Sequence, residues 1–216
     1  RRARWFAILA APAILVGAYT YYYSDTLTTI NGSYWTTNGS VAATSNGLTA
    51  SSANGGSIIS LVTAPGNPSE YEVNTRLRLT ASGAGGVYTH YLHATPDALS
   101  GPAGQGTYYA VEVAPTLGSN GLCFATMELT MRSGGSSTSL ASTNVPCRDG
   151  MTVRSVIRAD GLILAYVDGY NYIKTTSTAI PGGQPGIGAR LTPAGNSINR
   201  VDLGPRDSTA PDPVNA

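Results

Sequence analysis

The sequence predicts an all-β protein, an antiparallel sandwich of two sheets that is preceded by one N-terminal transmembrane helix. Short runs of alternating apolar and polar residues fill the chain after Asp25, and turn residues separate these runs every ~8–12 positions. An uncharged apolar run near the N-terminus predicts the helix. We therefore divide the chain into an anchor over residues 1–23, a β-sandwich over 24–204 and a Pro-rich tail or linker over 205–216.

The composition is that of a folded domain. Of the 216 residues, 42% are hydrophobic and 12% are charged, and the net charge is +1. Disordered chains combine low hydrophobicity with high net charge, so this chain does not belong among them. Three arginines, Arg1, Arg2 and Arg4, open the chain, and no further basic cluster follows that would form a nucleic-acid footprint. We expect no nucleic-acid partner.

The N-terminal segment has the features of a membrane anchor. Roughly 19 uncharged residues from Trp5 to Tyr23 would span about 28 Å as a helix, close to the ~30 Å hydrocarbon core of a bilayer. Pro12 would kink this helix, which membrane helices tolerate. Trp5 at one end and tyrosines at the other fit the aromatic belts of the two interfaces. These tyrosines are Tyr19, Tyr21, Tyr22 and Tyr23.

The arginines before the apolar run set the expected orientation. Positive residues stay on the cytoplasmic side, so the N-terminus would be cytoplasmic and the β-domain periplasmic or extracellular. This arrangement predicts a single-pass protein of the cell membrane. A cleaved signal peptide is the alternative, because the small residues at 16–18 would suit a cleavage site.

The body of the chain reads as a series of strands. Residues 33–44 predict a strand, an Asn-Gly turn and a second strand, and Asp160-Gly161 and Asp168-Gly169 predict two tight hairpins. The other predicted strands cover residues 55–62, 70–80, 85–95, 106–114, 123–134, 137–146, 151–161, 162–169, 170–178, 186–191 and 198–204.

One strand shows the alternation clearly. Tyr71, Val73, Leu77 and Leu79 share one parity, which Thr75 interrupts. Side chains of one parity lie on one face of a strand, so this pattern predicts a half-buried antiparallel strand.

The two cysteines, Cys123 and Cys147, predict a disulfide. An anchor or export signal places the domain in an oxidising compartment, where disulfides persist. The bridge would close a loop of about 25 residues and contribute on the order of 3 kcal/mol. Two buried free thiols are the alternative.

The order of these strands resembles the concanavalin A-like lectin and glucanase superfamily, and laminin-G-like bacterial domains in particular. The resemblance covers about residues 25–204, and its most telling part is DGLILAYVDG followed by IPGGQPGIGAR. It implies a two-sheet jelly roll in which one sheet is concave and often used for binding. Hydrolases, lectins and adhesion modules share this fold, so function must be argued from side chains.

No catalytic constellation is visible. The hydrolytic members of the superfamily carry a Glu-x-Asp-x-x-Glu strand, which this chain lacks. Glu70 and Glu72 share a strand face, where we expect a solvated edge. The chain also lacks a Gly-x-Ser-x-Gly nucleophile elbow. We therefore predict that the protein is not an enzyme and needs no cofactor.

A sugar platform is the binding site that the sequence supports. Tyr108 and Glu112 lie on one face of a predicted strand, where an aromatic ring and a hydrogen-bond acceptor would suit a sugar. Tyr91 is the third candidate ligand-binding residue. The alternative for Glu112 is a polar position on the sheet without a ligand.

We predict no metal site. His90 and His93 are three apart on a strand, so they should point to opposite faces unless a bulge intervenes, and packing or surface roles are expected for both. Calcium would need clustered oxygen ligands. Asp25 and Asp97 are the available contributors, but no dense Asp/Asn loop surrounds them, and Asp168 fits a hairpin turn.

Two hypotheses for function follow. The first is a non-catalytic, membrane-anchored domain that serves as an accessory or scaffold subunit of a larger membrane-protein assembly, with the membrane and other subunits as partners. The alternative is a carbohydrate-binding, lectin-like module of a surface or secreted protein, with a polysaccharide as its partner. Saccharide binding through Tyr108 would distinguish the second from the first.

Overall fold

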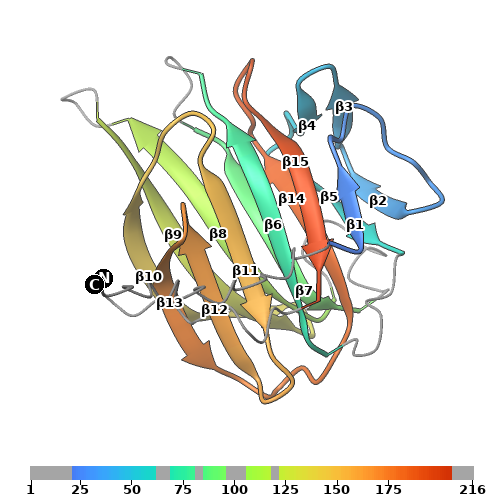
Figure 1. Cartoon of the computed structure of the whole chain (residues 1–216), viewed down its shortest axis with the longest axis vertical. Helices are drawn as coiled ribbons and strands as arrows, with labels where there is room; N and C mark the ends of the chain where they lie inside the picture. The colour runs from blue at the N-terminus through green and yellow to red at the C-terminus, as the bar shows by residue number, and fades with distance from the viewer. Residues whose placement is uncertain (1–20, 62–68, 81–84, 96–105, 118–121, 206–216) are drawn as a thin grey trace, which may run out of the picture.

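The computed structural model is a sandwich of two β-sheets (Figure 1) and describes residues 21–61, 69–80, 85–95, 106–117 and 122–205. Every element within these ranges is a strand. In chain order they are β1 (Tyr23–Asp25), β2 (Trp35–Gly39), β3 (Ala42–Thr44), β4 (Gly47–Thr49), β5 (Gly56–Ser60), β6 (Tyr71–Arg78), β7 (Val87–Ala94), β8 (Tyr108–Leu117), β9 (Cys123–Ser133), β10 (Ser136–Pro146), β11 (Thr152–Ile157), β12 (Leu162–Val167), β13 (Tyr170–Thr176), β14 (Gln184–Arg190) and β15 (Ser197–Gly204).

The strands form two antiparallel sheets, as the sequence predicts. Sheet A has eight strands, in the order β13-β12-β11-β6-β15-β4-β3 with β1 beside β15. Sheet B has seven, in the order β10-β9-β8-β7-β14-β5-β2. Strands far apart in the chain are neighbours in each sheet, so connections pass between the two layers, as in a jelly roll (Figure 1).

Alternation along β8 divides its side chains between two environments. Tyr109, Val111 and Val113 belong to the core between the sheets and are at most 1% exposed. Tyr108 and Ala110 belong to a separate cluster on the other side of sheet B. The period of two along a strand therefore supplies both the core and an outer surface.

The core also contains a polar bridge between the two sheets. Thr75 of β6 is buried, and its Oγ1 lies 2.7 Å from His90 Nε2 of β7. The other ring nitrogen of His90, Nδ1, lies 2.8 Å from Ser155 Oγ of β11. A neutral imidazole has one donor and one acceptor nitrogen, and a hydroxyl can serve either, so all three groups can be satisfied. Thr75 interrupts the apolar face of β6 because His90 bonds to it.

We predicted that His90 and His93 face opposite ways, but both lie in the core because of a bulge in β7. The pairing of β7 with β14 shifts register between Gln184 and Gly186, and His93 has a positive φ of 51°. The His93 ring consequently lies among core residues, with Nδ1 2.8 Å from the Ile180 carbonyl oxygen. Both histidines are buried, so the predicted packing role is confirmed and the predicted opposite orientation is wrong.

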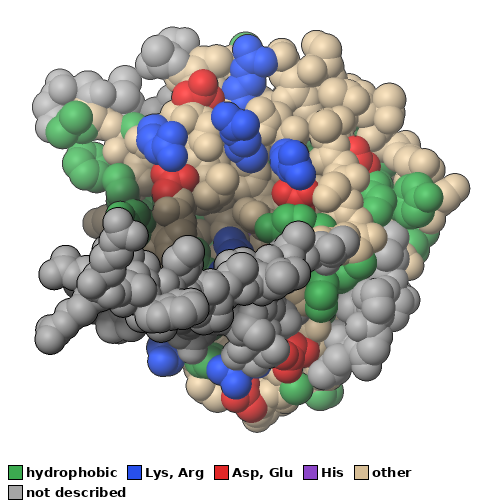
Figure 2. Space-filling model, viewed as in Figure 1, with side chains coloured by type: hydrophobic (Ala, Val, Ile, Leu, Met, Phe, Trp, Pro, Cys, Tyr) green, Lys and Arg blue, Asp and Glu red, His purple; other side chains and the backbone are tan. Residues whose placement is uncertain are grey.

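Glu72 is likewise not on the solvated edge that we predicted. β6 lies in the middle of sheet A, and Glu72 is 2% exposed. Arg154 donates to Glu72 Oε2 from Nε at 2.8 Å and from Nη2 at 2.6 Å. Figure 2 shows basic and acidic side chains close together on one face of the molecule. The ion pair offsets the cost of burying this carboxylate.

The Asp-Gly dipeptides form the predicted hairpins. Asp160-Gly161 joins β11 to β12, and Asp168-Gly169 joins β12 to β13. Asp168 has a φ of 49°, and its Oδ1 accepts a hydrogen bond from Thr152 N at 2.8 Å, so it is a turn residue as predicted. Residues 33–44 do not form a hairpin, because β2 pairs with β5 in sheet B and β3 pairs with β4 in sheet A.

The predicted disulfide is present. Cys123 and Cys147 are bonded, with their Cα atoms 5.1 Å apart. Cys123 begins β9 and Cys147 follows β10, and Cys147 N donates to the Cys123 carbonyl at 3.2 Å. The bridge therefore closes the open end of the β9–β10 hairpin.

The predicted anchor covers residues 1–23, and residues 1–20 lie outside the described residues, so this part of the transmembrane helix, with Trp5, Pro12 and Tyr19, stays a prediction. The described chain, from residue 21 with its internal gaps, contains no helix long and apolar enough to cross a membrane. Tyr21, Tyr22 and Tyr23, which we predicted at the end of the membrane helix, lie on the sandwich instead, because β1 pairs with β15. Tyr23 begins β1 and pairs with Leu203, and Asn74 donates to the Tyr21 hydroxyl at 3.1 Å.

The buried His90 makes acid sensitivity a testable property of the core. Burial lowers the pKa of His90 from 6.5 to about 3. Between these values the unfolded chain binds a proton that the folded chain does not, so stability falls as pH decreases from about 6.5 toward 3. The slope from this residue is at most about 1.4 kcal/mol per pH unit. Urea unfolding of His90→Gln between pH 7 and pH 4 should show a shallower pH dependence than the wild type. An identical slope in the two proteins would contradict this account.

Candidate functional site

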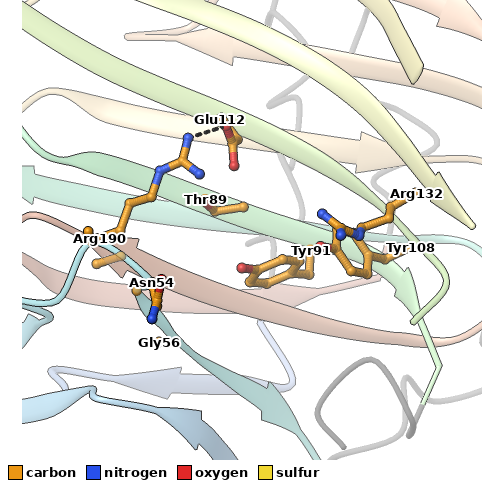
Figure 3. A pocket seen from close by; sticks show the side chains of 11 residues that line it. Asn54, Gly56, Thr89, Tyr91, Tyr108, Glu112, Arg132 and Arg190 are labelled. Atoms are coloured by element: carbon orange, nitrogen blue, oxygen red, sulfur yellow. Dashed lines mark hydrogen bonds and ion pairs between the residues drawn. The ribbon is translucent and has the colours of Figure 1, made fainter. Parts of the chain in front are cut away.

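The predicted ligand-binding residues come together on the outer face of sheet B. Tyr91 of β7 and Tyr108 and Glu112 of β8 line one hollow of about 200 Å³ (Figure 3). A second hollow of about 350 Å³ adjoins it and shares Tyr108, Glu112, Arg132 and Arg190. The two form one surface, here called the outer groove. Its principal side chains are Tyr91, Tyr108, Glu112, Glu128, Arg132 and Arg190.

One part of the outer groove is aromatic. The rings of Tyr91 and Tyr108 lie edge to face, with centroids 5.0 Å apart and planes at 88°. Burial raises the pKa of both hydroxyls, and the Arg132 guanidinium beside Tyr108 opposes this effect in part. Both hydroxyls are therefore protonated at neutral pH and can donate as well as accept hydrogen bonds.

Glycines of β14 make room for this aromatic part. A Cβ atom on Gly188 would lie 2.8 Å from Tyr91 Cε2 and 2.9 Å from the Gly56 carbonyl oxygen. A Cβ atom on Gly186 would lie 2.3 Å from Ile59 Cδ1. Only the absence of a side chain lets the Tyr91 ring lie this close to the strand. The Gly-rich segment therefore shapes the floor of the outer groove.

Another part of the outer groove is charged. Arg190 Nη2 donates to Glu112 Oε2 at 3.0 Å (Figure 3). Glu112 stands directly opposite Glu128 in the register of β8 and β9. Burial raises the pKa of Glu112, Arg190 lowers it, and the negative charge of Glu128 raises it. The outer groove thus holds two carboxylates on neighbouring strands, one of them paired with a cation.

The remaining two charges of the outer groove have no ion-pair partner within the described part of the chain. These are Glu128 and Arg132, both on β9. The Arg132 Nε atom is buried and has no hydrogen-bond partner. Arg132 Nη2 lies 3.4 Å from the Gly135 carbonyl oxygen, a long and weak contact. Arg132 also hydrogen-bonds to the Tyr108 side chain, and its exposed Nη2 end keeps donor capacity beside the two tyrosines (Figure 3).

Sequence reasoning did not identify Glu128, Arg132 or Arg190. The alternation along the strand over residues 123–134 could have indicated Glu128 and Arg132. Met127 and Leu129 are fully buried, and the intervening Glu128 has the parity of the outer face, as does Arg132. Arg190 carried no such signal, because its position depends on the pairing of β14 with β7 across a long stretch of chain.

The described residues contain no group of three or more His, Cys, Asp or Glu side chains that could hold a metal ion. Asp25, one of the two acids considered for calcium, uses its oxygens within the fold. Its Oδ2 accepts from the Tyr23 hydroxyl at 2.6 Å and from Trp35 Nε1 at 3.2 Å, and its Oδ1 accepts from Leu27 N at 2.7 Å. Asp97 lies outside the described residues.

Comparison with known proteins gives structural neighbours only. No protein-family model matches the chain, and no curated protein matches its sequence. A carbohydrate-binding module, CBM66 from Bacillus subtilis, is 15% identical, with a TM-score of 0.53, and the match covers 79% of this chain and 92% of the module. The Emp46p carbohydrate recognition domain in its potassium-bound form is 16% identical (TM-score 0.56; 86% and 98% covered). A Bacillus licheniformis β-glucanase is 14% identical (TM-score 0.50; 85% and 98% covered).

Identities this low show the fold alone. The neighbours comprise binding domains and a glucanase, so they do not decide between binding and hydrolysis. The described residues have the concanavalin A-like lectin and glucanase fold that the sequence resemblance implies.

The charges of the outer groove predict opposite shifts in the titration of Glu112. Arg190→Gln removes a nearby cation and should raise the pKa of Glu112 further. Glu128→Gln removes a nearby anion and should lower it. Carboxyl-carbon NMR of the two variants measures both shifts, with Arg148→Gln, which affects an ion pair with Asp168 elsewhere, as the control. Shifts in the same direction would disprove the described arrangement.

Proposed function

We propose that this protein is a non-catalytic carbohydrate-binding module and that the outer groove is its binding site. One observation carries the proposal: the outer groove combines a pair of tyrosine rings with hydrogen-bonding side chains on the same open face of the sheet. Of the two functions considered from the sequence, this is the alternative. The described residues give no comparable support to an accessory subunit of a membrane assembly.

The chemistry of sugars matches this combination. A pyranose has apolar C–H faces and a rim of hydroxyl groups, so it is bound well by an aromatic ring that is flanked by donors and acceptors. Tyr91 and Tyr108 line the outer groove, and the 8% of Tyr108 that is exposed is the part that a sugar can contact. Glu112 and Glu128 provide acceptors, and Arg132 and Arg190 provide donors. These groups lie on strands, which hold them in fixed positions before a ligand arrives.

The structural neighbours support the proposal at the level of the fold. CBM66 and Emp46p are described as a carbohydrate-binding module and a carbohydrate recognition domain. The disulfide is consistent with an oxidising compartment. Together with the predicted anchor, the disulfide supports a location on the outer side of the cell membrane, where the module would meet polysaccharides, with the N-terminus in the cytoplasm.

Glycoside hydrolysis is a second candidate function, because one observation favours it. Glu112 has a raised pKa and stands opposite a second carboxylate, Glu128, and paired carboxylates are the usual machinery of glycosidases. Against this, Arg190 donates to Glu112 Oε2 and stabilises the ionised form, whereas a general acid must hold a proton. We therefore propose binding without turnover.

The test of the binding site is Tyr108→Ala in the full chain, kept in mild detergent. The wild type should bind a soluble polysaccharide in a glycan-array or calorimetric assay, and the variant should bind it at least about tenfold more weakly, which corresponds to ~1.4 kcal/mol. Tyr170→Ala is the matched control, because Tyr170 is 65% exposed at the start of β13 in the other sheet. Equal losses in the two variants would rule out the outer groove as the site.

The same samples distinguish binding from hydrolysis. Incubation of the wild type with β-glucans should release no reducing ends while binding persists. Release of reducing ends that Glu112→Gln abolishes would replace the proposed function with a glycosidase activity.

A further inference from the structure

We infer that the outer groove selects anionic polysaccharides and that Arg132 is the residue that recognises the acid group of the sugar. This inference rests on the proposed function and narrows its ligand class. The outer groove contains four charged side chains, and only two of them are ion-paired among the described residues. Arg190 and Glu112 form an ion pair with each other at 3.0 Å. Arg132 and Glu128 take part in no ion pair within the described ranges.

The two unpaired charges are too far apart to neutralise each other. They lie on the same side of β9 and are four positions apart, so their Cα atoms are separated by roughly 13 Å at ~3.3 Å per residue. Arg132 stands opposite Tyr108 in the register of β8 and β9, and Glu128 stands opposite Glu112. The outer groove therefore has a cationic part beside the aromatic rings and an anionic part further along the same strands.

Arg132 is also incompletely bonded. Its Nε atom is buried without a hydrogen-bond partner, although Arg132 lines both hollows. The Nη2 end of the guanidinium is exposed and its 3.4 Å contact with the Gly135 carbonyl oxygen is long, so it can donate to an acceptor that a ligand supplies. The planar fork of a guanidinium matches the two oxygens of a carboxylate and also binds the oxygens of a sulfate. An acidic sugar could therefore place its charged group on Arg132 and its ring against Tyr91 and Tyr108.

The anionic part of the outer groove favours a sugar that is bound with its acid group on Arg132. Glu128 and Glu112 repel a second acid group but accept hydrogen bonds from sugar hydroxyls. A chain that carries an acid group on one residue and free hydroxyls on the next would satisfy both parts. A neutral polysaccharide would bind only to the anionic part of the outer groove, and Arg132 would remain without a charged partner.

The experiment compares three galactose-based polymers as ligands of the full chain in detergent: polygalacturonate, the same polymer after reduction of its carboxyl groups, and a sulfated galactan. At low salt the wild type should bind one of the acidic polymers roughly tenfold to a hundredfold more tightly than the reduced polymer, as expected for a charge-assisted hydrogen bond. The preferred acidic polymer identifies carboxylate or sulfate as the group that is recognised. High salt should reduce the preference because ions screen an exposed site.

Arg132→Gln should abolish this preference, and a urea unfolding midpoint equal to that of the wild type would show that the variant is folded. Arg148→Gln makes the same change in net charge at an arginine whose side chain is 66% exposed, and it should retain the preference. A wild type that binds neutral and acidic polymers equally, or a preference that survives in Arg132→Gln, overturns the inference but leaves the proposed function intact. Failure to bind any of the three polymers, together with no binding on the glycan array, overturns both.

Discussion

The register between β8 and β9 is the constraint on which the outer groove depends. It sets Tyr108 opposite Arg132 and Glu112 opposite Glu128, and it sends the intervening residues into the core. Because side chains alternate along a strand, a shift of one residue in β9 would exchange its apolar and polar faces. Met127 and Leu129, both fully buried, make such a shift costly. The packing of the core therefore also holds the charges of the outer groove in place.

The polar bridge inside the core fixes the relation between the two sheets in a different way. Apolar contacts are not directional, so they hold two layers together without specifying one alignment. The hydrogen bonds from His90 to Thr75 and Ser155 do specify an alignment, because each is lost if β7 moves along β6 and β11. His90 lies one position from Tyr91 on the same strand. The alignment that satisfies the buried imidazole thus also positions an aromatic ring of the outer groove.

Much of this structure could be predicted from local sequence, because strand alternation and Asp-Gly hairpins involve residues close together in the chain. The face shared by Tyr71, Val73 and Leu77 and the hairpin at Asp168 are examples. Tyr108 and Glu112 were identified in the same way, from parity on a single strand. Their partners could not be found so directly. Arg190 reaches Glu112 only because β14 is the neighbour of β7, and single-sequence patterns do not encode which distant strands are adjacent.

Two corrections have the same physical origin. Glu72 was expected at a solvated edge, but β6 occupies the middle of sheet A, and Arg154 from the neighbouring β11 pairs with it. His93 was expected on the opposite face from His90, but the bulge in β7 returns it to the core. A bulge and a place in the strand order are both properties of how strands pair, and neither can be inferred from the residue types along a single strand.

The distribution of charge in the outer groove separates what the fold requires from what a ligand requires. Glu72 and Asp202 are buried acids of sheet A, and the fold itself supplies Arg154 and Arg200 as their partners. In the outer groove, Arg190 and Glu112 form an ion pair with each other, whereas the partly buried Arg132 has no ion-pair partner among the described residues. Leaving the Arg132 guanidinium and the Glu128 carboxylate without ion-pair partners gains the fold nothing in stability, because shielding an unpaired charge from water costs free energy. We expect a ligand to supply an acceptor for Arg132, next to the tyrosine rings that would hold a sugar.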